Sequence, residues 1–414
     1  MAWLLTPCAG AACAAWLFLL FCRGGFWRAD QRLPPEPGPL LAWPDIMAVI
    51  PARNEADVIG RAIHSLLVQD YPAHFSLVLV DDHSDDDTAE IARAAAAALG
   101  RADRLAIISS AALPAGWMGK MWAVNQGIAE ARRLRDTPYV LLSDADIEHE
   151  PGNLRRLVAL AETERRDLVS LMVHLHCRSS WERLLIPAFV FFFQLLYPFP
   201  LVNRRGSDVA AAAGGCMLVR SRALERIGGV AAIHDAIIDD CALARLIKTR
   251  QNDKGCSGAI WLGLSERTRS LRPYNGLRDI WGTVARTAYT QLRRSPVLLI
   301  GAMLPFALVF LAPPALLAVS AITGAGLATT LAGLAWVTMA ACYGPTMRIY
   351  GEPVFRTALL PLAAAFYFAM TFDSARRHWL GRGGAWKGRT CDETAPDTTV
   401  STQACHYADR RNFG

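Results

Sequence analysis

Hydrophobic residues follow one pattern in the middle of the chain and a different one near its ends. Between residues 45 and 295, short apolar runs alternate with segments in which apolar residues recur at helical spacing. Near the ends, residues 4–21 and 297–345 form long runs that carry no charged residue. The middle pattern predicts a globular domain, and the end pattern predicts helices long enough to cross a bilayer.

The middle region repeats a unit of strand, loop and helix. A possible N-cap, Asn54, precedes the first predicted helix, and Pro151 stands at a plausible first position of a later one. This alternation predicts an α/β fold with a mostly parallel sheet covered by helices on both faces. The strands are expected at residues 46–50, 76–80, 105–109 and 139–146, and the helices that follow begin near residues 55, 88, 120 and 151.

The first apolar run has no positive residue before it and three arginines after it, Arg23, Arg28 and Arg32. This order favours a retained membrane anchor over a cleaved signal peptide, with its C-terminal side in the cytoplasm. Arg293 and Arg294 stand just before the second apolar block and likewise favour a cytoplasmic location for the residues on that side. We therefore expect the domain between them to be cytoplasmic in a multi-pass membrane protein.

The second apolar block can hold two spans of about 20 residues each. A further apolar segment at residues 358–372 is shorter. A third crossing would place Arg376, Arg377 and Lys387 outside, against the bias of basic residues toward the cytoplasm. We expect two C-terminal spans and a third segment that only associates with the membrane.

These patterns divide the chain into regions. Residues 181–202 are almost as apolar as a span and are expected to lie at the bilayer surface as an interfacial or re-entrant element, with a buried core helix as the alternative. The predicted regions are a membrane anchor at 1–32, a proline-rich linker at 33–44, a cytoplasmic domain at 45–295, transmembrane segments at 296–373, and a basic, polar, partly disordered tail at 374–414.

Composition supports a membrane protein and excludes several classes of site. Hydrophobic residues make up 53% of the chain, above the share of a typical soluble protein. The 10 cysteines include no C-x-x-C pair, which argues against a disulfide framework or a zinc site. The net charge of +6 gathers beside the apolar runs, which suits an anionic lipid surface rather than a nucleic acid.

Two carboxylates end the fourth predicted strand, in the sequence LLSDADIEHE. Asp144 and Asp146 offer the hard oxygen ligands that Mg²⁺ or Mn²⁺ prefers, and such an ion could bridge the protein to a diphosphate. A turn or a helix cap is the competing explanation for an isolated Asp-x-Asp. Asp82 follows the second strand, and because ligands gather at the carboxyl ends of parallel strands, these carboxylates are expected to converge.

Three further features could contribute chemistry. Lys120 stands at a glycine-flanked helix start, where its ammonium could meet a phosphate. Gly214 and Gly215 would let the backbone approach a ligand closely, although layer packing explains them equally well. Asp239 and Asp240 begin a predicted helix, and one of them could act as a general base. His174 and His176 are interpreted as strand residues and not as metal ligands.

In chain order, the motifs PARNE, VDD, GK, DAD, GG and IDD resemble those of family 2 inverting glycosyltransferases with a GT-A fold. The apolar segment before Asn203, the WKGR sequence at residues 386–389 and the C-terminal spans resemble the hopanoid-biosynthesis-associated and ceramide-glucosyltransferase-like branch. The resemblance implies a bacterial inner-membrane enzyme with a cytoplasmic catalytic domain. It also implies a nucleotide-sugar donor, UDP-linked in the simplest case, and a lipid acceptor.

The resemblance also assigns roles to residues. Asp240 corresponds to the catalytic base of the family's Thr-Glu-Asp, although Ile238 and Asp239 replace the first two residues of that motif. Gln291 and Arg294 match part of Gln-x-x-Arg-Trp, in which Ser295 stands for the tryptophan, so single-sugar transfer is expected instead of polymerisation. The implied donor-binding residues are Pro51, Arg53, Glu55, Asp82, Lys120 and Asp144; the metal ligands are Asp144 and Asp146; and the acceptor side has Gly214, Gly215, Asp239, Gln291 and Arg294.

Two other functions use the same residues. A membrane protein that binds or transports a nucleotide-sugar would show no turnover. A metal-dependent nucleotidyl or phosphoryl transferase would release a different product from the same crevice.

Overall fold

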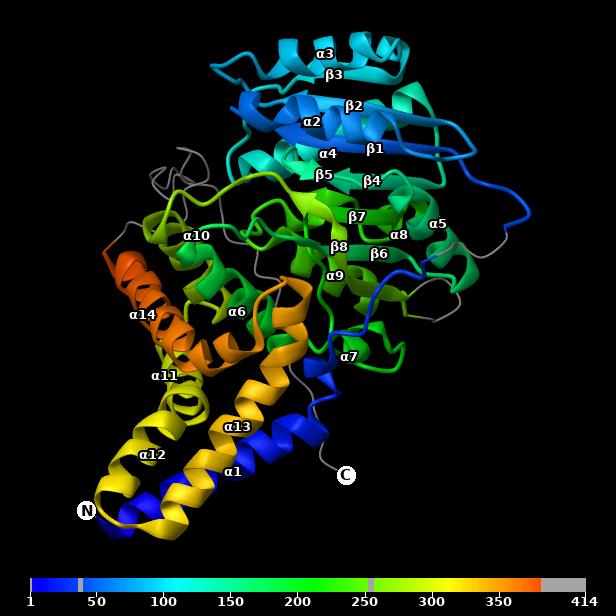
Figure 1. The fold of residues 1–414 in the computed structure, drawn as a ribbon. Helices are drawn as coiled ribbons and strands as arrows, with labels where there is room; N and C mark the ends of the chain where they lie inside the picture. The colour runs from blue at the N-terminus through cyan, green and yellow to red at the C-terminus, as the bar shows by residue number, and fades with distance from the viewer. Residues whose placement is uncertain (1, 36–39, 252–256, 381–414) are drawn as a thin grey trace, which may run out of the picture.

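The computed structural model describes residues 2–35, 40–251 and 257–380, and it separates into a layered α/β domain and a bundle of long helices (Figure 1). In its described part, four helical segments are long and apolar enough to cross a membrane, at Leu4–Cys22, Pro296–Ile322, Gly326–Ile349 and Val354–Trp379. The WKGR sequence and most of the predicted tail lie outside the described residues. The predicted tail boundary is wrong by several residues, because helix α14 (Leu360–Trp379) continues through residues 374–379.

The domain is built on one mixed sheet of eight strands in the order β3-β2-β1-β4-β7-β6-β8-β5. Strands β3, β2, β1 and β4 run parallel, as predicted, whereas β7 pairs antiparallel with both of its neighbours. The strands are β1 (Ile46–Ala52), β2 (Phe75–Asp81), β3 (Leu105–Ser109), β4 (Tyr139–Ser143), β5 (Ile147–Glu148), β6 (Leu168–His174), β7 (Cys216–Arg220) and β8 (Ile260–Ser270).

Helices cover both faces of this sheet, which confirms the predicted fold class. Alternate residues of β1 and β2 enter different apolar cores, because neighbouring side chains of a strand point to opposite faces. One core contains α2 (Ala56–Leu67), α3 (Thr88–Ala98) and α5 (Asn153–Thr163); the other contains α4 (Gly119–Leu134), α8 (Ser221–Arg226) and α9 (Asp239–Thr249).

Two helices begin within two residues of the expected positions, at Ala56 and Asn153, but the roles predicted for Asn54 and Pro151 at these starts are wrong. Asn54 is not an N-cap: it adopts a left-handed backbone conformation, and its side chain accepts a hydrogen bond from the backbone N–H of Asp85 at 2.8 Å. Pro151 precedes the first residue of α5, Asn153, by two positions. In both places the residue predicted as a cap or as the first helical position lies in the turn before the helix.

Helix α4 packs unusually close to the sheet at Gly127. A Cβ atom there would lie 2.4 Å from Val49 Cγ1 and 2.8 Å from Val80 Cγ2. We expect Gly127→Val to lower the free energy of unfolding by about 1–3 kcal/mol, as overpacking of a core does. Thermal melting should show this loss, whereas Gly282→Ala, whose added Cβ meets no atom within 4 Å, should not reduce stability. Equal melting temperatures for Gly127→Val and the parent would contradict this packing.

The apolar segment 181–202 forms α6 (Ser180–Leu196) and α7 (Phe199–Asn203), between the domain and the long helices. Its inner face is buried: Leu185, Ile186 and Phe191 join an apolar core that also holds residues of the long helices, such as Trp16 and Tyr343. Glu182 caps the start of α6 and bonds His176 Nδ1 at 2.7 Å. The segment therefore joins the two parts of the molecule, and its contact with the bilayer stays a prediction.

The last long segment is longer than expected, and it turns back toward the domain. Trp336 Nε1, in the middle of α13 (Gly326–Ile349), donates to the Ala358 carbonyl at 3.3 Å, just before α14 begins. At the other end of α14, Asp373 accepts a hydrogen bond of 2.8 Å from Trp281 of α10 (Leu277–Gln291). Arg376 and Arg377 pair with this Asp373, so they lie beside α10 (Figure 1). By length and composition the segment Val354–Trp379 could cross a membrane, and the expectation that it only associates with one stays a prediction.

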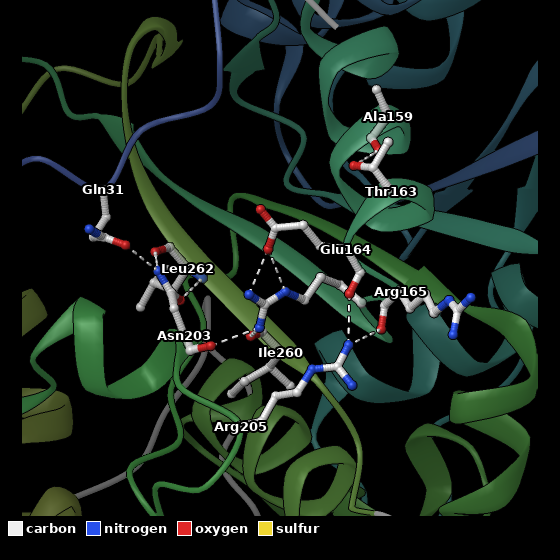
Figure 2. A network of polar contacts seen from close by, with 10 residues as sticks. Gln31, Ala159, Thr163, Glu164, Arg165, Asn203, Arg205, Ile260 and Leu262 are labelled. Atoms are coloured by element: carbon white, nitrogen blue, oxygen red, sulfur yellow. Dashed lines mark hydrogen bonds and ion pairs between the residues drawn. The ribbon is translucent and has the colours of Figure 1, made fainter. Parts of the chain in front are cut away.

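The chain that follows α1 (Ala2–Cys22) is attached to the edge of the domain. The backbone N–H of Leu264 donates to the Gln31 carbonyl at 2.8 Å, and Arg32 forms a bridge with the same strand β8. Asn203 at the end of α7 donates to Gln31 Oε1 at 2.9 Å and to the Leu262 carbonyl at 3.0 Å (Figure 2).

A network of charged residues also holds Asn203 and β8 in place. The Arg166 guanidinium donates to the Asn203 carbonyl at 2.7 Å and to the Ile260 carbonyl at 2.9 Å, and it pairs with Glu164 at 2.6 Å. Arg205 donates to the Glu164 carbonyl at 2.8 Å (Figure 2). Residues 31 and 32 are thus fixed to the sheet before the predicted linker begins.

Candidate active site

The candidate residues gather at the carboxyl ends of β1, β2 and β4, and at the start of α9. Lys120 is the central group: its Nζ lies 2.9 Å from Asp144 Oδ1 and 3.2 Å from Asp239 Oδ2. Burial alone would lower the pKa of Lys120, but Asp144 and Asp239 outweigh it and raise the pKa. The ammonium is therefore held charged between two carboxylates, and its side chain stays 23% exposed.

Asp240 is held in a fixed orientation by backbone donors. Its Oδ2 accepts from the Gly214 N–H at 2.9 Å, and its Oδ1 accepts from the Cys241 N–H at 2.7 Å. Gly214 lies directly against both charged groups: a Cβ atom there would make ordinary van der Waals contacts at 3.5 Å from Asp240 Oδ2 and 3.6 Å from Lys120 Nζ. Burial and then the neighbouring Asp239 raise the pKa of Asp240 to about 7, against the opposite effect of Lys120. A carboxylate with this pKa can accept a proton near neutral pH.

Pro51 lies near the end of β1, and the loop that follows carries Arg53 and Glu55 and packs against the end of β2. Arg53 donates to the Asp82 carbonyl at 2.7 Å, and the buried Asp82 carboxylate accepts from Ser110 Oγ at 2.7 Å. Pro51 lines a small cavity together with Lys120, Asp144, Gly214 and Asp239. Asp82 thus fixes the loop, while Pro51 borders the same space as the central lysine.

Arg272, which the sequence did not single out, links two of the predicted residues. Its guanidinium contacts Glu55, and its Nε lies 3.8 Å from Asp146 Oδ2. Ser270 Oγ donates to Asp146 at 2.8 Å from the end of β8. Arg272 lies 217 residues from Glu55 in the chain and follows the polar second half of β8, Ser265–Ser270, so no hydrophobic pattern indicated it.

The carboxylates fit a divalent cation only in combination with a ligand. In residues 2–35, 40–251 and 257–380, no group of three or more His, Cys, Asp or Glu side chains could hold a metal by itself. Burial, followed by Asp144, raises the pKa of Asp146, and a nearby cation would relieve this repulsion. Asp144 and Asp146 therefore fit an ion that takes its other ligands from a bound diphosphate and water.

A large apolar cavity of about 640 Å³ opens from Asp239 and Asp240 toward the long helices. Its walls come from α6, α9, α10, α11 (Pro296–Phe306) and α14. Apolar side chains such as Phe193, Met303 and Phe306 form most of the lining. Asp239 and Asp240 thus line a large cavity whose other walls are mostly apolar.

Gln291 and Arg294, the predicted acceptor-side residues at and just after the end of α10, are placed differently. Gln291 lines the apolar cavity and contacts the Tyr197 hydroxyl. Arg294 is not among the described residues that line it, and it adopts a left-handed conformation just after the helix. The structure therefore places Gln291 in the same cavity as Asp239 and Asp240. Gly215 lies behind the site, where a Cβ atom would meet Ile147 and Val173 at 3.3 Å.

Comparison with known proteins agrees with this architecture. Residues 47–228 match the family model of Glycosyl transferase family 2. Succinoglycan biosynthesis protein ExoU of Rhizobium meliloti is 33% identical over 115 residues, which cover 28% of this chain and 30% of that protein. Undecaprenyl-phosphate 4-deoxy-4-formamido-L-arabinose transferase of Pseudomonas savastanoi is 29% identical over 178 residues, 42% of this chain and 46% of that protein. The chain thus spans less than half the length of either relative.

One solved structure resembles nearly the whole chain. The mannosyltransferase PcManGT from Pyrobaculum calidifontis, in complex with GDP-Man and Mn²⁺, superposes with a TM-score of 0.50 at 18% identity. The match covers 90% of this chain and 99% of that one. At this identity the likeness concerns the fold.

Proposed function

We propose that this chain, which carries a glycosyl transferase family 2 domain over residues 47–228, transfers one sugar from a UDP-sugar to the hydroxyl group of a membrane lipid with inversion. The observation that supports this most is the position of Asp240: it lines the apolar cavity of about 640 Å³, and it accepts a hydrogen bond from Gly214, which lines the small cavity at Lys120. A soluble donor would enter from one side and a lipid from the other. Hopanoid or glycolipid biosynthesis is the pathway that the resemblance suggests.

Asp240 would act as the general base. Its backbone hydrogen bonds from Gly214 and Cys241 orient the carboxylate, and its raised pKa matches proton abstraction from a hydroxyl at neutral pH. The deprotonated oxygen attacks the sugar carbon from the cavity side while the diphosphate leaves from the opposite side. This direct displacement inverts the configuration of that carbon.

Lys120, Asp144 and Asp146 would serve the leaving diphosphate. Lys120 supplies a positive charge at the start of α4, where backbone N–H groups also favour an anion. Asp144 and Asp146 would hold Mg²⁺ or Mn²⁺, which when bound neutralises charge on the leaving phosphate. Pro51, Arg53, Glu55 and Asp82 would form the wall for the nucleoside.

The proposal is tested by turnover of the full chain in nanodiscs. A panel of UDP-sugars is supplied with lipid extract and Mn²⁺, and both UDP release and glycolipid mass are measured. We expect UDP and one singly glycosylated lipid to appear in equal amounts. UDP-sugar binding with no product would favour a binding or transport protein, and pyrophosphate release would favour a nucleotidyl transferase.

The pH dependence of transfer should follow the Asp240 carboxylate. Since the deprotonated form accepts the proton and the pKa is raised to about 7, the rate should fall as pH drops below neutrality. We expect kcat/KM to rise between about pH 6 and pH 8 and then level. A rate that is flat over this interval would argue against Asp240 as the base.

Removal of divalent cations should stop most transfer. We expect EDTA to lower the rate by about 100-fold or more, because the leaving diphosphate then carries uncompensated charge. Mg²⁺ or Mn²⁺ should restore the rate in the parent but only weakly in Asp146→Asn. Full activity in EDTA would remove the metal from the proposal.

A further inference from the structure

A second cavity, of about 200 Å³, lies between the start of α6, the end of α13 and the segment Val354–Leu359. None of its lining residues also lines the cavity at Asp240. Its apolar wall consists of Leu184, Tyr343, Met347, Leu359 and Leu362, and its polar lining residues are Ser180, Arg183 and Arg356.

The two arginines share one buried carboxylate. Arg183 Nε lies 3.4 Å from Glu352 Oε1, and Arg356 donates to Glu352 Oε2 at 2.6 Å. Glu352 is only 9% exposed, whereas the arginine side chains are 47% and 30% exposed. Because two positive charges face one negative charge, the cluster keeps one excess positive charge beside the cavity.

The cavity also adjoins the end of one candidate membrane span and the beginning of another. Tyr343 and Met347 belong to the candidate span Gly326–Ile349, and Leu359 and Leu362 belong to the segment Val354–Trp379. Basic pockets between membrane helices on the cytoplasmic side are typical binding sites for anionic lipid headgroups. This cavity combines two arginines, which can bind a headgroup phosphate, with an apolar wall that can contact acyl chains.

We propose that this cavity binds the phosphodiester headgroup of phosphatidylglycerol, with Arg183 and Arg356 on the phosphate and the acyl chains along Leu359 and Leu362. A monoanionic phosphodiester balances the excess charge of the cluster. Both oxygens of Glu352 already face the arginines, so the carboxylate is poorly placed for the ammonium of a zwitterionic lipid. The site is separate from the proposed acceptor cavity and would hold a resident lipid.

Native mass spectrometry of the full chain tests this without any sugar donor. Micelles of the purified protein are titrated with phosphatidylglycerol, phosphatidylethanolamine and phosphatidylcholine of identical chains. We expect one phosphatidylglycerol to bind in preference to the other two. Arg183→Gln or Arg356→Gln should each weaken this binding by about fivefold, the effect of roughly 1 kcal/mol per arginine near a lipid surface.

Two variants separate a specific site from a general effect. Glu352→Gln removes the opposing charge and should tighten phosphatidylglycerol binding, a gain that a poorly folded variant cannot produce. Arg376→Gln with Arg377→Gln is the matched control, since these arginines also share one carboxylate, that of Asp373, but do not line the cavity. Equal binding of the three lipids, equal losses in the control, or weaker binding by Glu352→Gln would each overturn the proposal. Because no sugar transfer is measured, these outcomes are independent of the proposed enzymatic function.

Discussion

Asp240→Asn is expected to lower the turnover number by about 10²–10⁴-fold, the usual contribution of a general base. The amide keeps a similar shape, but it cannot take a proton, and its single oxygen can accept only one of the two backbone hydrogen bonds that Gly214 and Cys241 give to the carboxylate. Donor binding should change little, because Lys120 pairs with Asp144 and Asp239 rather than with this side chain. Turnover is measured with saturating donor and lipid, and donor affinity is measured by calorimetry.

The matched control is Asp235→Asn, an exposed carboxylate close in sequence that does not line either cavity at the site. It should retain parental turnover. Any residual activity of Asp240→Asn should also lose its dependence on pH near neutrality. If Asp240→Asn lost donor affinity to the same extent as turnover, the side chain would be a donor-binding group and the assignment as base would fail.

Ala288→Trp should lower kcat/KM for the lipid by about 100-fold, or roughly 2.8 kcal/mol, which is close to the value of burying one apolar side chain. Ala288 lies on α10 and lines the apolar cavity, so an indole would occupy the space proposed for the acceptor. The donor crevice is formed by other elements, and UDP-sugar affinity should be kept. Glycolipid formation at several lipid fractions in nanodiscs gives the measurement.

Ala369→Trp provides the control for adding an indole to a membrane-facing helix. Ala369 is exposed on α14 and does not line the cavity, although Phe368 beside it does. This variant should transfer sugar as the parent does. Equal activity of Ala288→Trp and the parent would show that the lipid reaches Asp240 by another path.

The strands that were predicted from sequence are those with continuous apolar runs. Strands β1, β2 and β4 are almost entirely buried, and the edge strand β3 is half-buried, so the positions of all four follow from hydrophobicity within a few residues. Strand β8 was missed because its second half, from Ser265, is polar and partly exposed, where pairing and not burial holds the strand.

The site was predictable only where it follows strand and helix ends. Asp144, Lys120 and Asp239 stand at such ends. In the folded chain Lys120 Nζ lies 2.9 Å from Asp144 Oδ1 and 3.2 Å from Asp239 Oδ2. Arg272 reaches Glu55 and Asp146 from a loop after β8, and Tyr197 reaches Gln291 from the end of α6. These contacts depend on how separate layers dock, which no local pattern in the sequence encodes.

The hydrogen bonds that join Gln31 to Asn203 and to β8 have a kinetic consequence for an enzyme working on a membrane. A catalytic domain on a loose tether could rotate and extract a lipid, but this domain is hydrogen-bonded to the residues that follow α1, a helix long and apolar enough to cross a membrane. Each catalytic cycle would then wait for a lipid to arrive by lateral diffusion. The velocity should accordingly depend on the acceptor's mole fraction within the bilayer and not on its bulk concentration.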